Sequence, residues 1–365
     1  MMTERFIATV LIAIGILVPL YAEDGDFVLA FEGPRRYNNY IPSGADLSLT
    51  YNGLSLYPSG DTKLRLLAGG GYENGILLRD TITGDPWKAD ADGLAFDTPN
   101  FQWDLAFIQG LSRRADGDNL VSVFAEYRGR FDIHSNEGEQ DAVFADMHGL
   151  FGTSVMGGAS YDSRERSAHN AISGVYAEAS AEWGPGFANA RTDFWRVSGQ
   201  LRGFLPVLDI PSDGGNLFNA YLAGFAGVDA SGGTAVPMYV NESFGGSELR
   251  GSLGDCVRGY PAKSYDSSFK SVANVELRLL GPALGADSIV PVLYGFFDAG
   301  WYSGFAGSTN YASASGLLAS VGGGAAIDVA GAVQLGAYAG MTLVDASLYY
   351  PKEAVFWSVM LFSHF

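Results

Sequence analysis

Strict alternation of apolar and polar residues along much of the chain is the feature that most constrains its fold. In residues 121–132, VSVFAEYRGRFD, the odd positions are mostly apolar and the even positions mostly polar or charged. The same period of two runs through residues 175–183 (VYAEASAEW), 195–203 (WRVSGQLRG) and 272–280 (VANVELRLL). Successive side chains of a β-strand point to opposite faces, so each stretch predicts a strand with one apolar and one polar face.

Alternation alone also fits a soluble β-sandwich, and the residue types on each face decide between the two. The polar faces carry charges such as Glu126, Arg128 and Glu276, which a wet lumen allows. The apolar faces carry Trp183 and Trp195 near strand ends, as an interfacial girdle requires. Only 17% of the residues are charged, 13% are aromatic and 49 are glycine, which is typical of transmembrane barrels. The sequence therefore predicts an all-β, antiparallel transmembrane β-barrel.

The N-terminal residues 1–22 are predicted to be a secretory signal peptide. Their apolar stretch, FIATVLIAIGILVPL from Phe6, is about 15 residues long and too short to span a bilayer comfortably. An uncleaved anchor is the alternative interpretation. Cleavage after Ala22 would leave residues 23–365, 343 in all (365 − 22), as the barrel domain. Cys256 is the only cysteine, so no internal disulfide is possible.

The chain has room for about 16 strands at roughly 20 residues per strand and turn. Fifteen are predicted from the pattern, and because bacterial single-chain barrels use even counts, we expect one more within 76–98 or 133–150. The predicted strands lie near 27–33, 45–56, 62–72, 101–112, 119–132, 149–161, 172–184, 192–206, 216–228, 236–243, 269–280, 289–302, 315–329, 332–345 and 353–365.

The C-terminal residues 355–365, VFWSVMLFSHF, also alternate. An ordinary buried terminal strand is one interpretation. The segment also resembles the closing strand of outer-membrane barrels, although Ser363 on the lipid-facing side departs from that pattern. The face expected toward lipid carries Val355, Trp357, Val359 and Leu361, and the chain stops on Phe365.

Two acids and one arginine in the last third of the chain form the candidate site. Glu276 and Asp298 lie on the polar faces of successive predicted strands, so in a barrel both point inward. An infolded hairpin carrying Arg258 could meet them, because a guanidinium donates two parallel hydrogen bonds to a carboxylate. Gly259 lets the tip bend and Tyr260 can pack it against the wall. The alternative is that both acids simply face a wet lumen.

The motifs VRGY at 257–260, ANVELR at 273–278 and FFDAGWY at 296–302 resemble those of the BamA/TamA superfamily of outer-membrane barrels, also called the bacterial surface antigen family. The resemblance implies that the sixth extracellular loop folds into the lumen, with Arg258 at its tip and the two acids as its partners. It covers about residues 155–365. Further family-like marks are Asp162 and Arg164 of YDSRERS, Gly174, the strand FWRVSGQLRGFLPVL, and Gly245 and Gly246 of ESFGGSEL.

Two departures from the family pattern stand out. Family members carry periplasmic POTRA domains before the barrel, whereas only residues 23–26 separate the predicted signal peptide from the first strand here. A second candidate tip, LRGS with Arg250, lies closer to the glycine pair than Arg258 does. We prefer Arg258, because Tyr260 and the run into ANVELR match the family better.

The resemblance implies an assembly role in the outer membrane of a diderm (Gram-negative-type) bacterium. Such a barrel inserts or translocates outer-membrane proteins through a seam between its first strand, near 27–33, and its last, near 355–365. Its expected partners are outer-membrane lipid, client barrels, and a periplasmic or POTRA-bearing protein. The alternative is a passive channel or structural surface antigen that keeps the barrel without insertase activity.

Other chemistry is not indicated. The net charge of −18 argues against nucleic acid, whose binding depends on Lys and Arg at phosphates. His134, Ser135 and Asn136 are adjacent, which places them poorly as a catalytic triad, so we expect no enzyme. We also expect no cofactor and no metal site, since no ligand spacing links the histidines His134, His148, His169 and His364.

Overall fold

The computed structural model describes residues 27–36, 42–76, 95–115, 117–133, 149–167, 170–189, 192–212, 215–247, 251–260, 265, 267–284, 289–304, 315–329, 333–345 and 354–363. They form fifteen strands and two short helices. The strands are β1 (Phe27–Arg36), β2 (Pro42–Leu54), β3 (Thr62–Ile76), β4 (Ala95–Arg113), β5 (Asn119–Ile133), β6 (Gly149–Asp162), β7 (Glu165–Ser167), β8 (Asn170–Gly184), β9 (Asp193–Ser212), β10 (Gly215–Ala235), β11 (Phe269–Leu280), β12 (Ile289–Ser303), β13 (Ser315–Val329), β14 (Val333–Thr342) and β15 (Val355–Ser363). The helices are α3 (Met238–Glu242) and α4 (Leu253–Cys256).

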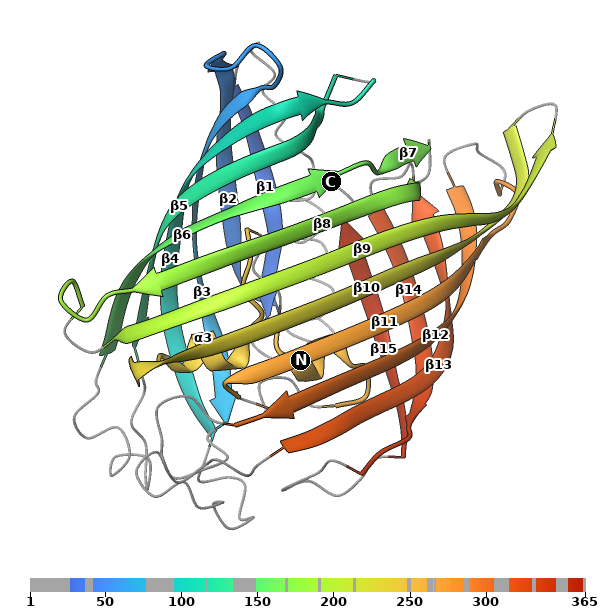
Figure 1. Ribbon diagram of the computed structural model, residues 1–365. Helices are drawn as coiled ribbons and strands as arrows, with labels where there is room; N and C mark the ends of the chain where they lie inside the picture. The colour runs from blue at the N-terminus through green and yellow to red at the C-terminus, as the bar shows by residue number, and fades with distance from the viewer. Residues whose placement is uncertain are drawn as a thin grey trace, which may run out of the picture.

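All strands but β7 form one antiparallel meander. Of the 15 strands in the sheet, β7 pairs only with β8, and the other 14 (15 − 1) follow one another in chain order from β1 to β15. The sheet curves into a barrel-like wall, with α3 on its inner side (Figure 1). Within the described part of the chain, no backbone ladder joins β1 to β15. The predicted all-β antiparallel fold is confirmed, and the described wall has two free edges.

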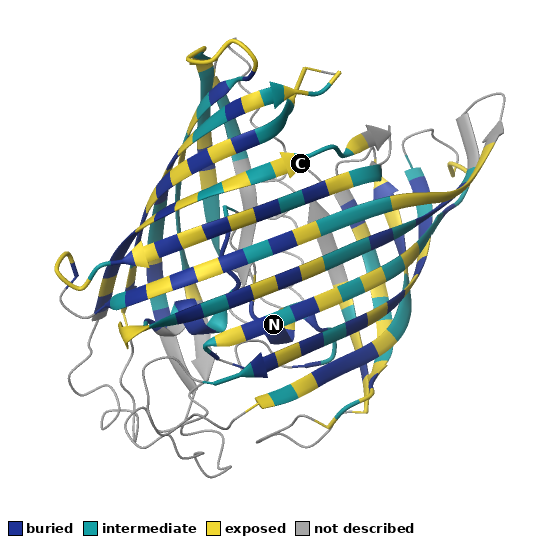
Figure 2. Ribbon diagram, in the orientation of Figure 1, coloured by how far each residue is buried: buried dark blue, intermediate teal, exposed yellow. Residues whose placement is uncertain are grey.

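The two faces of the wall differ as the alternation predicts. Along β5, Glu126 and Arg128 are buried on the inner face, while Val123, Tyr127 and Phe131 are exposed on the outer face. Buried and exposed residues alternate in bands along the strands (Figure 2). An outer face of this composition is suited to contact with lipid, because exposed apolar side chains are stable against lipid tails.

The connections differ in length between the two rims. One rim joins its strands through residues 77–94, 134–148 and 236–268, and the other has shorter connections such as 114–118 and 213–214. Transmembrane barrels have longer extracellular loops and short periplasmic turns. We therefore expect the rim of residues 236–268 to be extracellular.

The connection 236–268 between β10 and β11 is here called the infolded segment, because its described residues contact inward-facing side chains of many strands. A strand predicted at 236–243 is wrong, since this stretch contains helix α3. Pro237 starts the helix and has no N–H to continue a ladder. Beyond Ala235 the chain has left the wall, so its backbone bonds locally, with Val240 N donating to Pro237 O at 3.0 Å.

Each of the other fourteen predicted strands coincides with a described strand within a few residues at most ends. The additional strand expected within 76–98 or 133–150 falls largely outside the described residues, so the count of sixteen stays a prediction. The same holds for the signal peptide at 1–22. Neither described helix is long and apolar enough to cross a membrane.

Candidate functional site

Helix α4 sets up the tip of the infolded segment. It begins with a capping box, in which Ser252 Oγ accepts from Asp255 N and Asp255 accepts from Ser252 N. Leu253 and Val257 are fully buried against inward-facing side chains of β11, β12 and β13. This packing fixes the direction in which residues 257–260 leave the helix, and it aims Arg258 at the wall.

Arg258 binds both acids that the sequence placed on the inner face. Its Nε and Nη2 donate to Asp298 Oδ2 and Oδ1 at 2.6 and 2.7 Å, a bidentate pair. Its Nη1 donates to Glu276 Oε1 at 2.7 Å, and its backbone N donates to Asp298 at 3.2 Å. The guanidinium also lies 3.6 Å from the ring centroid of Phe296. The structure thus brings together three residues that are 18 and 40 positions apart.

The neighbours of these acids complete the charge balance. Asp298 is fully buried and accepts a further bond from Asn274 Nδ2 at 2.8 Å, while Glu276 also binds Arg278 at 2.7 Å. Burial opposes the charged form of Arg258, but the hydrogen bond to Asp298 and the charges of both acids outweigh it and raise the pKa of the guanidinium. Arg258 therefore stays a cation in the lumen.

Gly259 and Tyr260 attach the same tip to the last strands. Gly259 has a φ of +91°, and a Cβ built there would lie 2.3 Å from Phe356 Cδ1 on β15. The buried hydroxyl of Tyr260 accepts from Ala319 N at 3.1 Å and lies 2.8 Å from Val344 O. The tip thus contacts the wall from β11 to β15.

The family-like residues Asp162, Arg164 and Gly174 lie on the opposite rim, where β6 leads into β7 and β8. Arg164 makes a bidentate pair with Asp162 at 2.9 and 2.7 Å and stacks over Tyr176, 4.7 Å from the ring centroid. Gly174 has a φ of +92°, and a Cβ there would lie 2.3 Å from a backbone oxygen of the preceding turn. Tyr176 in turn donates to Glu178 at 2.5 Å, which links this rim to the lumen.

The glycine pair lies where the infolded segment approaches β8 and β9 closely. A Cβ on Gly245 would lie 2.3 Å from Ser198 Oγ, and one on Gly246 would lie 2.8 Å from Glu178 Oε1. Gly246 also has a φ of +126°, which side chains rarely adopt. The pair is therefore needed for close contact with β8 and β9, a contact that the sequence did not reveal.

The C-terminal row faces outward along β15. Val355, Trp357 and Val359 are 67%, 72% and 61% exposed, among the higher values for large apolar residues in the described chain. The backbone of Leu361 pairs with Leu335 of β14. Phe365 lies outside the described residues. So does Arg250, the alternative tip, which leaves that choice a prediction.

No group of three or more His, Cys, Asp or Glu side chains among the described residues is arranged to hold a metal ion. The four histidines fall outside the described ranges.

Known proteins resemble this chain in fold. No protein-family model and no curated protein sequence matches it. Among solved structures, BamA from Haemophilus ducreyi lacking POTRA domains 1-3 aligns with a TM-score of 0.50 at 14% identity, over 88% of this chain and 62% of that one. CdiB from Acinetobacter baumannii aligns with a TM-score of 0.51 at 14% identity, over 88% and 50%. CdiB from Escherichia coli gives 0.50 at 15% identity, over 92% and 62%.

These likenesses confirm, at the level of fold, the predicted resemblance to barrels of the BamA kind. The chain spans between half and just under two thirds of the length of these three solved structures.

Proposed function

We propose that this protein is an assembly-type barrel of a diderm outer membrane, which inserts or translocates other outer-membrane proteins through the seam between β1 and β15. The observation that carries the proposal is the pair of free edges, since no ladder joins β1 to β15 within the described residues. An unpaired strand edge presents backbone donors and acceptors to which an incoming strand can pair. A client strand would extend the sheet at this point.

The environment of β15 supports this role. The outward-facing residues Val355, Trp357 and Val359 of β15 are strongly exposed, as is typical of residues that face lipid. A client strand paired with β15 would therefore lie within the bilayer. Its inner face carries the buried Phe356, which packs beneath Gly259. The tip therefore contacts the last strand from inside, and within the described residues no strand pairs with its free edge.

The second candidate is a passive channel or structural surface antigen. The infolded segment favours it, because Arg258 and Tyr260 tie this segment to the inner face of the wall, where it would obstruct the lumen. A plugged barrel of this kind would conduct ions poorly. We propose no enzymatic activity for either candidate.

A periplasmic or POTRA-bearing partner is part of the proposal. The solved BamA structure lacks POTRA domains 1-3, and this chain covers 62% of its length. We propose that this second protein binds clients in the periplasm and delivers them to the barrel. Co-purification of the tagged chain from outer membranes should bring such a partner along.

Depletion tests the proposal directly. We expect depletion to lower the folded amount of at least one other outer-membrane barrel, and re-expression of the wild-type chain to restore it. Arg113→Ala, which removes an exposed pair with Asp61, should restore it equally. An unchanged outer-membrane profile, together with ion conduction by the purified barrel, would replace assembly with the passive channel.

A further inference from the structure

The infolded segment has a second attachment, separate from its tip. Residues 245–247, here called the strap, contact the inner faces of β3, β5, β8 and β10. The tip contacts β11, β12, β13 and β15 instead. Since strand order follows chain order, the two attachments lie on different halves of the wall.

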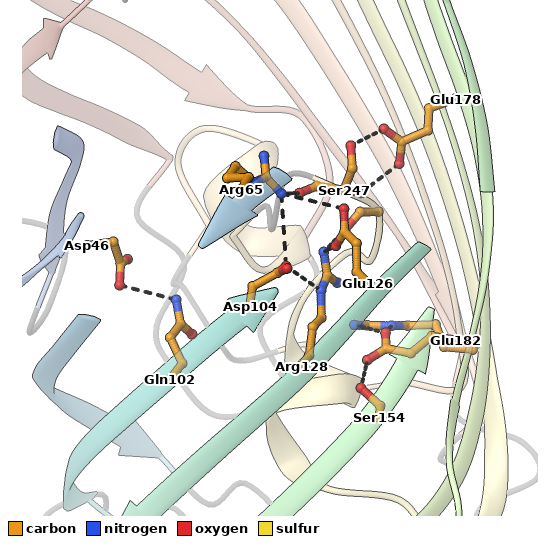
Figure 3. A network of polar contacts seen from close by, with 12 residues as sticks. Asp46, Arg65, Gln102, Asp104, Glu126, Arg128, Ser154, Glu178, Glu182 and Ser247 are labelled. Atoms are coloured by element: carbon orange, nitrogen blue, oxygen red, sulfur yellow. Dashed lines mark hydrogen bonds and ion pairs between the residues drawn. The ribbon is translucent and has the colours of Figure 1, made fainter. Parts of the chain in front are cut away.

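Charged side chains of the wall bind the backbone of the strap. Arg128 Nη2 donates to Gly246 O at 2.6 Å, and Arg65 Nη2 donates to Ser247 O at 3.2 Å. Glu178 Oε1 accepts from Ser247 N at 2.7 Å, and its other oxygen accepts from the Ser247 hydroxyl. Ser247 lies between Arg65 and Glu178 (Figure 3). Two carbonyls, one amide and one hydroxyl of the strap are thus bound by Arg and Glu side chains of the wall.

A second acid, Asp229, extends this attachment. Asp229 Oδ2 on β10 accepts from Gly245 N at 2.8 Å and from Ser198 Oγ at 2.8 Å. Asp229 is fully buried, and so is the neighbouring Lys270, 3.4 Å from its other oxygen. Three consecutive residues of the strap are therefore bound through their main chain.

The wall holds these side chains in place independently of the strap. Arg128 is paired with Asp104 at 2.9 Å and with Glu126 at 2.6 Å. Tyr176 donates to Glu178 at 2.5 Å from the adjacent position on the same face. The side chain of Glu126 is completely buried and that of Arg128 is 8% exposed. A prearranged set of donors and acceptors loses little side-chain freedom when it binds a peptide backbone.

We propose that Arg65, Arg128, Glu178 and Asp229 form a binding site for the peptide backbone of the strap, and that this site is a second lock on the lumen. It closes the half of the barrel lined by β3 to β10, while Arg258 with its acids closes the half lined by β11 to β15. The two locks share no side chain in the described contacts, so each releases without the other. The second lock does not depend on the proposed assembly role, because it would close a passive channel equally.

Conductance of the purified full chain in planar bilayers tests the proposal. Glu178→Ala removes both acceptors for Ser247 and should raise conductance above the wild-type level, even with Arg258 intact. Arg258→Ala should also raise it, and the double variant should exceed either single variant. Asp46→Asn is the matched control, since Asp46 is a carboxylate of β2 that accepts a hydrogen bond from Gln102 of β4 on the wall. This control should leave conductance at the wild-type level.

Thermal unfolding followed on gels gives an independent reading. Separate locks predict that the shifts in unfolding temperature of the two single variants add in the double variant, because distant sites without shared partners are additive. If Glu178→Ala does not fold, Glu178→Gln should give smaller shifts in the same directions. Conductance of the Glu178 variant no higher than that of Asp46→Asn would overturn the proposal. A double-variant temperature shift no larger than the greater single shift would do the same.

Discussion

Truncation of Arg258 tests the tip lock most directly. Arg258→Ala removes the three hydrogen bonds that the guanidinium donates. Two of them go to Asp298 and one goes to Glu276. Glu276 keeps Arg278 as a partner. Asp298 keeps only the amide of Asn274 and a backbone N–H among the bonds described, and it is fully buried. One carboxylate is thus left without a cation.

The loss of stability expected for Arg258→Ala follows from these lost contacts. Leaving one buried charge unpaired costs about 3–5 kcal/mol. Loss of the stacking on Phe296 adds about 0.5–2 kcal/mol. Access of lumen water to Arg258, whose side chain is 15% exposed, reduces the total. We therefore expect a decrease of about 3–5 kcal/mol in the free energy of unfolding.

Urea unfolding of the barrel in lipid vesicles measures this decrease, and folding before the assay is verified by heat-modified migration on gels. Arg258→Lys should recover part of the loss, since it restores the charge but not the bidentate geometry. Arg113→Ala is the control, because its pair with Asp61 is exposed on both sides and should contribute less than about 1 kcal/mol. A decrease for Arg258→Ala as small as that of the control would refute the reasoning.

Three further substitutions probe the tip and the outer face. Gly259→Ala should lower the free energy of unfolding by about 1–3 kcal/mol, because alanine is strained at a φ of +91° and its Cβ meets Phe356; the urea midpoint would show this, and an unchanged midpoint would contradict it. Tyr260→Phe should cost about 1–3 kcal/mol through the lost bond to buried Ala319, and it should increase protease cleavage of the infolded segment. Phe297→Arg places a cation on the lipid face of β12 and should cost about 2–4 kcal/mol in vesicles, more than the same change on an exposed turn.

The wall was predictable from the sequence because a period of two is a local property. The alternation within one strand, such as residues 121–132, identifies its inner and outer faces without any information about the neighbouring strands. The ends of the strands were less accurate, since β9 continues to Ser212 and β10 to Ala235, well past the predicted ends at 206 and 228. The one wrong strand, 236–243, failed for a related reason. Val240 is fully buried and Arg130 of β5 stacks over Tyr239, so α3 packs against the inner face of the wall without joining its ladder.

One part of the candidate site could be predicted from the sequence and the other could not. The tip could be predicted because Arg258, Glu276 and Asp298 lie in motifs that follow one another in a recognisable order. The alternation along β11 and β12 also places both acids on the inner face. The strap could not. Arg128 and Glu178 stand on polar faces in the sequence, but their shared partner lies 118 and 69 positions away. Only the register of several strands, together with the path of the infolded segment, brings these groups together.

The two halves of the lumen differ chemically, and the difference predicts which lock is stronger. The inner face of β12 is largely apolar, with Val292, Tyr294 and Phe296 all buried around the single acid Asp298. The inner faces of β5 and β8 instead carry rows of charges. A charge pair in apolar surroundings interacts more strongly and is harder to replace by water. The strap, held among many charges, can exchange its bonds for water at a lower cost. Hence Arg258→Ala should destabilise the barrel more than Glu178→Ala, and the strap should release first when the lumen opens.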